Sequence, residues 1–299
     1  EAVSAAKPAV RAQAKTEKVH GAASAAVLKG LVYGAAVLTF AVLLFLIGYI
    51  LVTGIPHLKP SLFQWNYTSE NVSMMPAILT TVETTALALL LAVPLGLFTA
   101  VYLNEYAKRG NKLVNVIRIT TETLSGIPSI VYGFFGLVVI VPLMAQLTGK
   151  NGNTMLTASI LLAVMILPTV VGVTESAITS VPESYYEASL GLGATHSQSV
   201  FFAVVPAAKS GILAGIVLGI GRAIGETMAV IMIAGNQPRM PKGITEGLRT
   251  MTANIVLEMG YASGIHREAL IATGVVLFVF ILLINLSVSM LNRRVHYGD

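Results

Sequence analysis

The feature that most constrains this chain is a set of six long apolar stretches separated by more polar segments. The first of them, from Leu31 to Val52, contains no charged residue. About 20 apolar residues in a helix are enough to cross the hydrocarbon core of a bilayer. Each stretch is therefore predicted to be a membrane-spanning helix. The approximate bounds are Leu31–Val52, Ala77–Leu103, Ile119–Met144, Met155–Val173, Ala207–Ala234 and Leu270–Met290.

The composition excludes several other classes of protein. Only 11% of the 299 residues are charged, against about 25% in soluble domains. The chain has no cysteine, and its five histidines show no metal-site spacing. A P-loop with the pattern GxxxxGKS or GxxxxGKT, which would hold nucleotide phosphates, does not occur. We therefore expect no catalytic residue, no metal, no cofactor and no nucleic-acid partner, and the chain is predicted not to be an enzyme.

Lysine and arginine predict the orientation, because cytoplasmic loops are enriched in both. They are frequent before the first stretch, after the second and at the C-terminal end, and rare after the first and third. Both termini are thus expected in the cytoplasm, in a multi-pass protein of the bacterial or archaeal cytoplasmic (inner) membrane. The positions that carry this expectation are Lys7, Arg11, Lys15, Lys18, Lys29, Lys108, Arg109, Lys112, Arg118, Arg293 and Arg294.

The segment 235–269 departs from this rule, since it is predicted to lie outside and carries four basic residues. They are Arg239, Lys242, Arg249 and Arg267. Apolar residues in this segment recur at helical spacing, which predicts an amphipathic helix at the outer surface. These apolar positions are Ile244, Leu248, Met251, Ile255 and Met259.

The segment 174–206 between the fourth and fifth stretches is the longest one predicted to be cytoplasmic. Ser180-Val181-Pro182-Glu183 has the pattern of a capping box, and Gly191 and Gly193 follow as a stop signal. A helix over about 182–190 is therefore predicted. Such a short helix is stable mainly when it docks on something.

This predicted helix carries a family resemblance. Glu187-Ala188, followed by Gly193 and Pro206, resembles the EAA signature of ABC-importer permeases. The sequence departs from that signature at Ser189, Ala203 and Val205. The resemblance implies that Glu187, Ala188 and Gly193 belong to a lever that couples the membrane helices to an ATPase subunit. An ordinary surface helix is the alternative interpretation.

Further segments resemble phosphate-specific ABC permeases, and the resemblance covers about residues 76–292. They are residues 125–136 (SGIPSIVYGFFG), 221–230 (GRAIGETMAV), 94–107 and 248–253. The resemblance favours the C-type over the A-type partner of the paired permeases. It implies an all-α, polytopic membrane helical bundle of about six transmembrane helices, like type I ABC-importer permeases.

The domain organisation follows from these stretches. Residues 1–30 are predicted to form a cytoplasmic N-terminal tail, and residues 31–76 the first transmembrane helix with an extracytoplasmic loop. Residues 77–292 are predicted to form the ABC-permease transmembrane domain, with the cytoplasmic coupling loop at 174–206.

Two charged residues stand inside the fifth stretch. An arginine within the bilayer is costly and usually faces a cavity or a partner. Arg222 and Glu226 are four residues apart, so in a continuous helix their side chains can meet. Arg222 is predicted to contact a permeating anion, because its guanidinium offers a bidentate fork suited to phosphate. A structural ion pair that locks the bundle is the alternative, and both roles can hold together.

Three other features complete the predicted path and its packing. Gly126 and Pro128 interrupt the third stretch, and a helix that restarts near Ser129 would point free N–H groups into the bundle. A simple kink for close packing is the alternative. Glu83, in the second stretch, is included in the predicted substrate path. A stripe of small residues in the fifth stretch predicts helix packing. It consists of Gly211, Gly215 and Gly219.

The sequence thus predicts the transmembrane subunit of an ATP-driven importer of inorganic phosphate. The partners implied by the resemblance are a second homologous permease subunit, two ATP-binding subunits, an extracytoplasmic phosphate-binding protein and membrane lipid. A permease for another oxyanion, such as sulfate or molybdate, is an alternative. A passive anion channel or an ion-coupled carrier is disfavoured, because neither needs a helix that docks on an ATPase.

Overall fold

The computed structural model describes the backbone of residues 7–107 and 110–296, and the side chains of residues 24–107, 110–287 and 290. Several basic residues used to predict orientation lie outside the described side chains: Lys7, Arg11, Lys15, Lys18, Lys108, Arg109, Arg293 and Arg294. The chain divides into two compact units, residues 1–53 and residues 54–299.

The first unit is built from one long helix. Helix α1 (Lys7–Gly54) begins well before the predicted span, so the predicted tail of residues 1–30 is helical from Lys7 onward. Its side chains from Ser24 to Leu46 are all exposed, although most of them are apolar. Residues 24–57 are long and apolar enough to cross a membrane, and lipid would cover such side chains.

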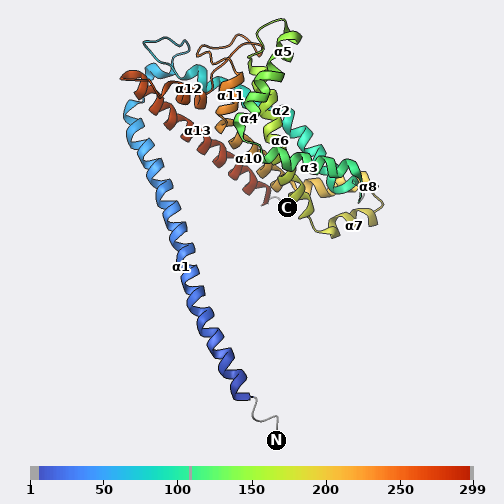
Figure 1. The fold of residues 1–299 in the computed structure, drawn as a ribbon. Coiled ribbons are helices and arrows are strands. Elements are labelled where there is room, and N and C mark those ends of the chain that lie inside the picture. Colours follow the sequence, from blue (N-terminus) through green and yellow to red (C-terminus); the bar gives the residue numbers. More distant parts are fainter. Residues whose placement is uncertain (1–6, 108–109, 297–299) are drawn as a thin grey trace. The chain divides into compact units, whose positions relative to one another are not determined.

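The second unit is a bundle of helices (Figure 1). Helices α2, α6 and α10 pack against one another at its centre. With these three helices, the unit contains 3-10 turns (η1 and η2), π-helical turns (η3, η4 and η5) and shorter or peripheral helices. In chain order they are η1 (Ile55–His57), η2 (Pro60–Phe63), α2 (Met75–Val101), η3 (Tyr102–Tyr106), α3 (Lys112–Gly126), α4 (Ser129–Phe135), η4 (Gly136–Ile140), α5 (Val141–Thr148), α6 (Met155–Thr179), α7 (Glu183–Gly191), α8 (His196–Ser199), η5 (Val200–Val204), α9 (Val205–Ala207), α10 (Lys209–Gly225), α11 (Met228–Ile233), α12 (Met251–Glu258) and α13 (Ile265–His296).

The predicted spans are confirmed in number and corrected in detail. Within the described residues, five helices are long and apolar enough to cross a membrane, and the total is six if a bent pair, 196–207 with 209–225, is counted as one span. The third span does not begin at Ile119, because the helix is interrupted between Gly126 and Ser129. The span is residues 129–148. The fifth is broken as well, since α10 ends at Gly225 and α11 starts at Met228.

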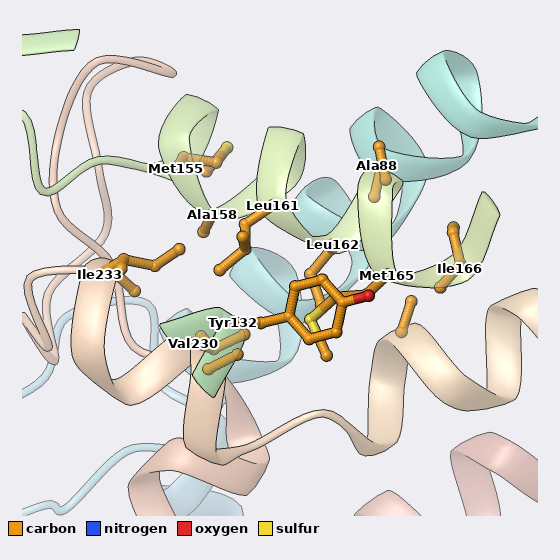
Figure 2. Close-up of a cluster of buried hydrophobic side chains, with 14 of the residues drawn as sticks. Ala88, Tyr132, Met155, Ala158, Leu161, Leu162, Met165, Ile166, Val230 and Ile233 are labelled. Atoms are coloured by element: carbon orange, nitrogen blue, oxygen red, sulfur yellow. The ribbon is translucent and has the colours of Figure 1, made fainter. Parts of the chain in front are cut away.

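The largest cluster of buried apolar side chains lies around α6. Figure 2 shows Leu162 and Met165 of α6 close to the ring of Tyr132 from α4, with Val230 of α11 beside it. Ala88 of α2 and Ala158 of α6 belong to this cluster and are fully buried. Small side chains let the backbones of membrane helices approach closely, so α6 is enclosed by its neighbours.

The predicted small-residue stripe packs α10 against α6. A Cβ atom on Gly211 would lie 2.4 Å from the Cβ of Ala177, and one on Gly215 would lie 3.2 Å from the Cβ of Val173. Gly219 of α10 faces Val170 of α6. The packing role predicted for the three glycines is confirmed.

The predicted amphipathic helix at the outer surface is wrong in extent and in burial. Residues 235–250 form an irregular segment, and the helix is confined to α12, whose start is capped by Thr250. Leu248 and Met251 are fully buried. Apolar side chains at helical spacing are also compatible with a loop that folds inward, and Gly243 and Gly247 oppose a continuous helix there.

Candidate functional site

The candidate substrate site is a junction at which the third and the fifth predicted stretches are both interrupted. The first break lies between α3 and α4, where Ile127 and Pro128 have extended backbone. The second lies between α10 and α11, where Glu226 is extended. The interruption that Gly126 and Pro128 predicted is therefore present, and a second one accompanies it.

The two helices that restart at these breaks pack against each other in parallel. A Cβ atom on Gly133 of α4 would lie 2.9 Å from the Cα of Ala229 in α11. Three residues further along, a Cβ on Gly136 would lie 3.1 Å from the Cγ2 of Ile233. Contacts that advance in the same direction along both helices place the second turn of α4 beside the first turn of α11.

Arg222 lies in the last turn of α10, directly before the second break. Its Nη1 donates to the hydroxyl of Thr169 on α6 at 3.3 Å. A cation is favourable at the C-terminal end of a helix. A guanidinium has five N–H donors, and within the described part of the chain only this one hydrogen bond uses them. The side chain can therefore still bind an anion.

The predicted contact between Arg222 and Glu226 is wrong in this conformation. The helix ends at Gly225, so the i to i+4 geometry that would bring the two side chains together does not exist. Glu226 Oε1 instead accepts from the backbone N–H groups of Thr227 and Ala229, both at 3.1 Å. Among the ion pairs of the described residues, none joins Arg222 to Glu226. The carboxylate is held by the backbone and leaves the guanidinium free of it.

Ser129 is the first residue of α4 and is half-buried at the first break. Three residues later, Tyr132 links α4 to α3 across the break. Its hydroxyl donates a hydrogen bond to the carbonyl of Leu124 in α3 at 2.6 Å. Tyr132 is buried. The hydrogen bond joins the two sides of the break and fixes the angle at which α4 leaves α3.

Glu83 lies away from this junction. Its neighbour Thr84 accepts a hydrogen bond from Ser159 of α6, whereas Arg222 bonds Thr169 of the same helix. Ten residues of helix correspond to about 15 Å. Glu83 is exposed and lines a separate cleft of about 610 Å³ with Lys242 and Ile244. The structure does not bring it together with Arg222, Glu226 and Ser129.

The second candidate site is α7, which lies where a helix over about 182–190 was predicted and carries the residues of the EAA resemblance. Glu187 and Ala188 are exposed on it. Its end is a Schellman motif, in which Gly193 N–H donates to the carbonyl of Leu190 and Ala194 N–H donates to that of Ser189. Gly193 has φ +91°, a conformation that glycine adopts at little cost. The predicted stop is confirmed.

The predicted capping box at the start of α7 is wrong. The N-cap residue is Pro182, which makes no side-chain hydrogen bond. Ser180 belongs to the end of α6, and its hydroxyl donates to the carbonyl of Ala177. A capping box occurs later, where Thr195 and Gln198 bond each other's backbone at the start of α8. The pattern of residue types did not distinguish the end of one helix from the start of the next.

Several residues at these sites were not predicted from the sequence. Thr169 contacts Arg222, Tyr132 joins α4 to α3, and His196 contacts α7. Thr169 follows Pro168 inside α6. This proline within a helix was the one feature of the sequence that could have drawn attention to Thr169. No group of three or more metal-binding side chains occurs within the described residues.

The fold and these sites match a known protein family. Residues 92–297 match the family described as binding-protein-dependent transport system inner membrane component. This match covers most of the chain, and the chain therefore belongs to that family of membrane subunits of transporters. It is a multi-pass protein of the inner membrane.

Curated relatives narrow the resemblance. The chain is 38% identical to the probable ABC transporter permease protein YqgH of Bacillus subtilis, over 74% of each chain. It is 35% identical to the phosphate transport system permease protein PstC of Mesorhizobium japonicum, over 74% of this chain and 73% of the relative. These relatives confirm the resemblance to phosphate-specific ABC permeases that the sequence segments indicated.

Solved structures support the fold. A chain of a bacterial ABC transporter involved in the import of alginate aligns with a TM-score of 0.58 at 17% identity, over 86% of this chain and 95% of that one. A chain of the MetNI methionine ABC transporter, in an inward-facing conformation, aligns with a TM-score of 0.55 at 19% identity, over 83% and 96%. At such identities the likeness concerns the fold alone, and the predicted fold class is confirmed.

Proposed function

We propose that this chain is the C-type permease subunit of an ATP-driven importer of inorganic phosphate. It acts with a second homologous permease, two ATP-binding subunits and an extracytoplasmic phosphate-binding protein. Both termini lie in the cytoplasm, and ATP is hydrolysed by the ATP-binding subunits. The observation that carries the proposal is the sustained similarity to curated phosphate permeases over about three quarters of the chain.

Arg222 supports an anionic substrate. A guanidinium that lies beside two helix breaks, and whose carboxylate neighbour is bonded to the backbone, retains a net positive charge for the permeating ion. The two oxygen atoms on one face of phosphate match the paired N–H groups of arginine. In the proposed path Arg222 binds phosphate transiently, with Ser129 and Glu226 at the same junction and Glu83 at a separate level.

The geometry of α7 supports coupling to a separate ATPase. The helix has no buried residue within the chain, and a helix of nine residues gains most of its stability from docking. Glu187, Ala188 and Gly193 form the coupling element in this proposal. The docked helix passes movement of the ATP-binding subunits to the spans on either side of it.

The proposal is tested by transport in liposomes that contain the complete complex. With ATP inside, the complex should accumulate radiolabelled phosphate against a gradient, and sulfate and molybdate should not compete. The purified chain alone should hydrolyse no ATP. Accumulation of sulfate or molybdate in place of phosphate would contradict the substrate. Uptake that only equilibrates and needs no ATP would instead indicate a passive channel.

A further inference from the structure

A cluster of three aromatic side chains joins α7 to the end of α2. The hydroxyl of Tyr186 on α7 is 2.8 Å from Nδ1 of His196, the first residue of α8. The other neighbour of this imidazole is Tyr106 of η3, with ring centroids 4.8 Å apart and planes at 67°. The Tyr106 hydroxyl also donates to Ser197 Oγ at 3.1 Å. We call Tyr106, Tyr186 and His196 the His196 clasp.

The clasp is a main attachment of α7 to its own chain. Side-chain capping is absent at the start of the helix, and none of its residues is buried. Tyr186 is half-buried and packs against the cluster that contains Ile178 and Val204. Tyr185 and Glu187, on either side of it, are exposed. The position of α7 relative to the spans therefore depends strongly on the contacts of this one side chain.

Both elements that meet α7 through the clasp adjoin π-helical turns. Tyr106 is the last residue of η3, which continues α2, and α8 leads directly into η5. A π turn holds one residue more than an α turn and occurs often at functional sites. A rigid contact between η3 and α8 can therefore carry a displacement of α7 to the second span and to the α8–α10 segment together.

We propose that the His196 clasp transmits movement between the coupling helix and the end of the second span, with His196 as the positioning residue. The proposal rests on the proposed function of α7. His196 bonds α7 through Nδ1 and packs its ring on Tyr106, so one side chain links the two elements. Without it, α7 remains a helix but no longer moves as one body with α2.

The first measurement is hydrogen exchange of the α7 amides in the full chain in detergent. Tyr186→Phe removes the hydroxyl and should speed local opening about fivefold, equal to about 1 kcal/mol at 1.4 kcal/mol per tenfold. His196→Ala also removes the ring contact and should have the larger effect. His196→Asn keeps a polar atom near the Nδ1 position and should be intermediate. Tyr102→Phe, on the same π turn as Tyr106, is the matched control.

A double variant separates a shared contact from two independent defects. Because Tyr186 and His196 act on each other, adding Tyr186→Phe to His196→Ala should change the exchange of α7 no further. If the two substitutions caused independent structural defects, their effects on the exchange of α7 would add. The control Tyr102→Phe should leave exchange unchanged, since its ring packs among apolar side chains of another cluster.

The second measurement is the number of phosphate ions moved per ATP hydrolysed by the complete complex in liposomes. This ratio should fall in the order set by hydrogen exchange, less for Tyr186→Phe than for His196→Ala, with assembly unchanged. Unchanged α7 exchange in His196→Ala would overturn the clasp. Faster exchange with an unchanged ratio would overturn its role in coupling. An unsubstituted complex that hydrolyses ATP but moves no phosphate contradicts the proposed substrate, and the exchange series still decides whether the clasp holds α7.

Discussion

Two connecting segments of this chain contrast in how they are held. The Arg249 loop, residues 235–258, lies between α11 and α13, and its Leu248 and Met251 are fully buried. The α7 loop, residues 180–199, lies between α6 and η5, and its Leu192 is 91% exposed. One segment finds its partners within the chain, and the other presents its side chains outward. The difference indicates which of the two is left for a partner subunit.

The Arg249 loop is bonded to several helices at once. Arg249 Nη1 donates to Glu258 Oε1 at 2.7 Å, and its Nε donates to the carbonyl of Asn236 at 3.0 Å. The carbonyl of Arg249 accepts from Thr80 of α2. Carbonyls of Ile244 and Glu246 accept from the first N–H groups of α6, which have no partner within their helix. The Arg249 loop therefore covers the N-terminal end of α6 and is held there by hydrogen bonds.

The largest expected effect comes from breaking the buried pair of the Arg249 loop. In Arg249→Ala, Glu258 is left without its cation, and the two side chains are only 12% and 18% exposed. We expect a loss of about 3 kcal/mol, the low end of the range for a broken buried pair. Arg239→Ala, at an exposed arginine of the same loop, should cost less than about 0.5 kcal/mol. The measurement is the free energy of unfolding in detergent, and equal losses for both variants would contradict the contrast.

A smaller effect is expected at the turn that ends α7. Gly193→Val forces a β-branched residue to φ +91°, which costs about 1–3 kcal/mol locally. A Cβ atom there meets nothing within 4 Å, so the strain is in the backbone alone. The complex should assemble and hydrolyse ATP while moving less phosphate per ATP. Gly193→Asn is the control, because asparagine tolerates positive φ. If both variants moved the same amount of phosphate per ATP, the backbone conformation of this turn would have no role in coupling.

The smallest perturbation tests exposure and topology. The chain has no cysteine, so Ser189→Cys places a single thiol on α7. We expect it to be protected from a membrane-impermeant reagent in intact cells and to cross-link to the ATP-binding subunit. Asn66→Cys, in the loop predicted to be extracytoplasmic, is the control and should be labelled from outside. Labelling of Ser189→Cys from outside would reverse the proposed topology and remove α7 as the coupling helix.

The spans could be predicted from the sequence because the apolar stretches are long and nearly free of charge. Of the two interruptions in these stretches, the sequence predicted the first and not the second. Gly126 and Pro128 indicated the break before α4, since proline lacks the N–H that a continuous helix needs. Gly225 gave only a weak signal for the break after α10, and the assumption of a continuous helix led to the wrong contact between Arg222 and Glu226.

Long-range contacts could not be predicted from local patterns. Thr169 reaches Arg222 across 53 positions of the sequence, and Tyr106 reaches Ser197 across 91. The apolar residues of 244–259 had helical spacing, but loop carbonyls that cap α6 hold the first part of that segment in an irregular conformation. Burial of a loop depends on which helices surround it, and the spacing of its own residues does not contain that information.

The central claim, that phosphate passes Arg222, is tested most directly by a substitution that keeps its charge. Arg222→Lys loses the bidentate fork, and we expect phosphate uptake per assembled complex to fall about tenfold or more. Arg222→Ala should be lower still. Since Glu226 is bonded to the backbone, neither variant leaves a carboxylate unpaired, and both should assemble. Arg239→Lys, the same change at an exposed site, is the control and should transport normally. Near-normal uptake of radiolabelled phosphate by Arg222→Ala would place the path elsewhere and contradict the claim.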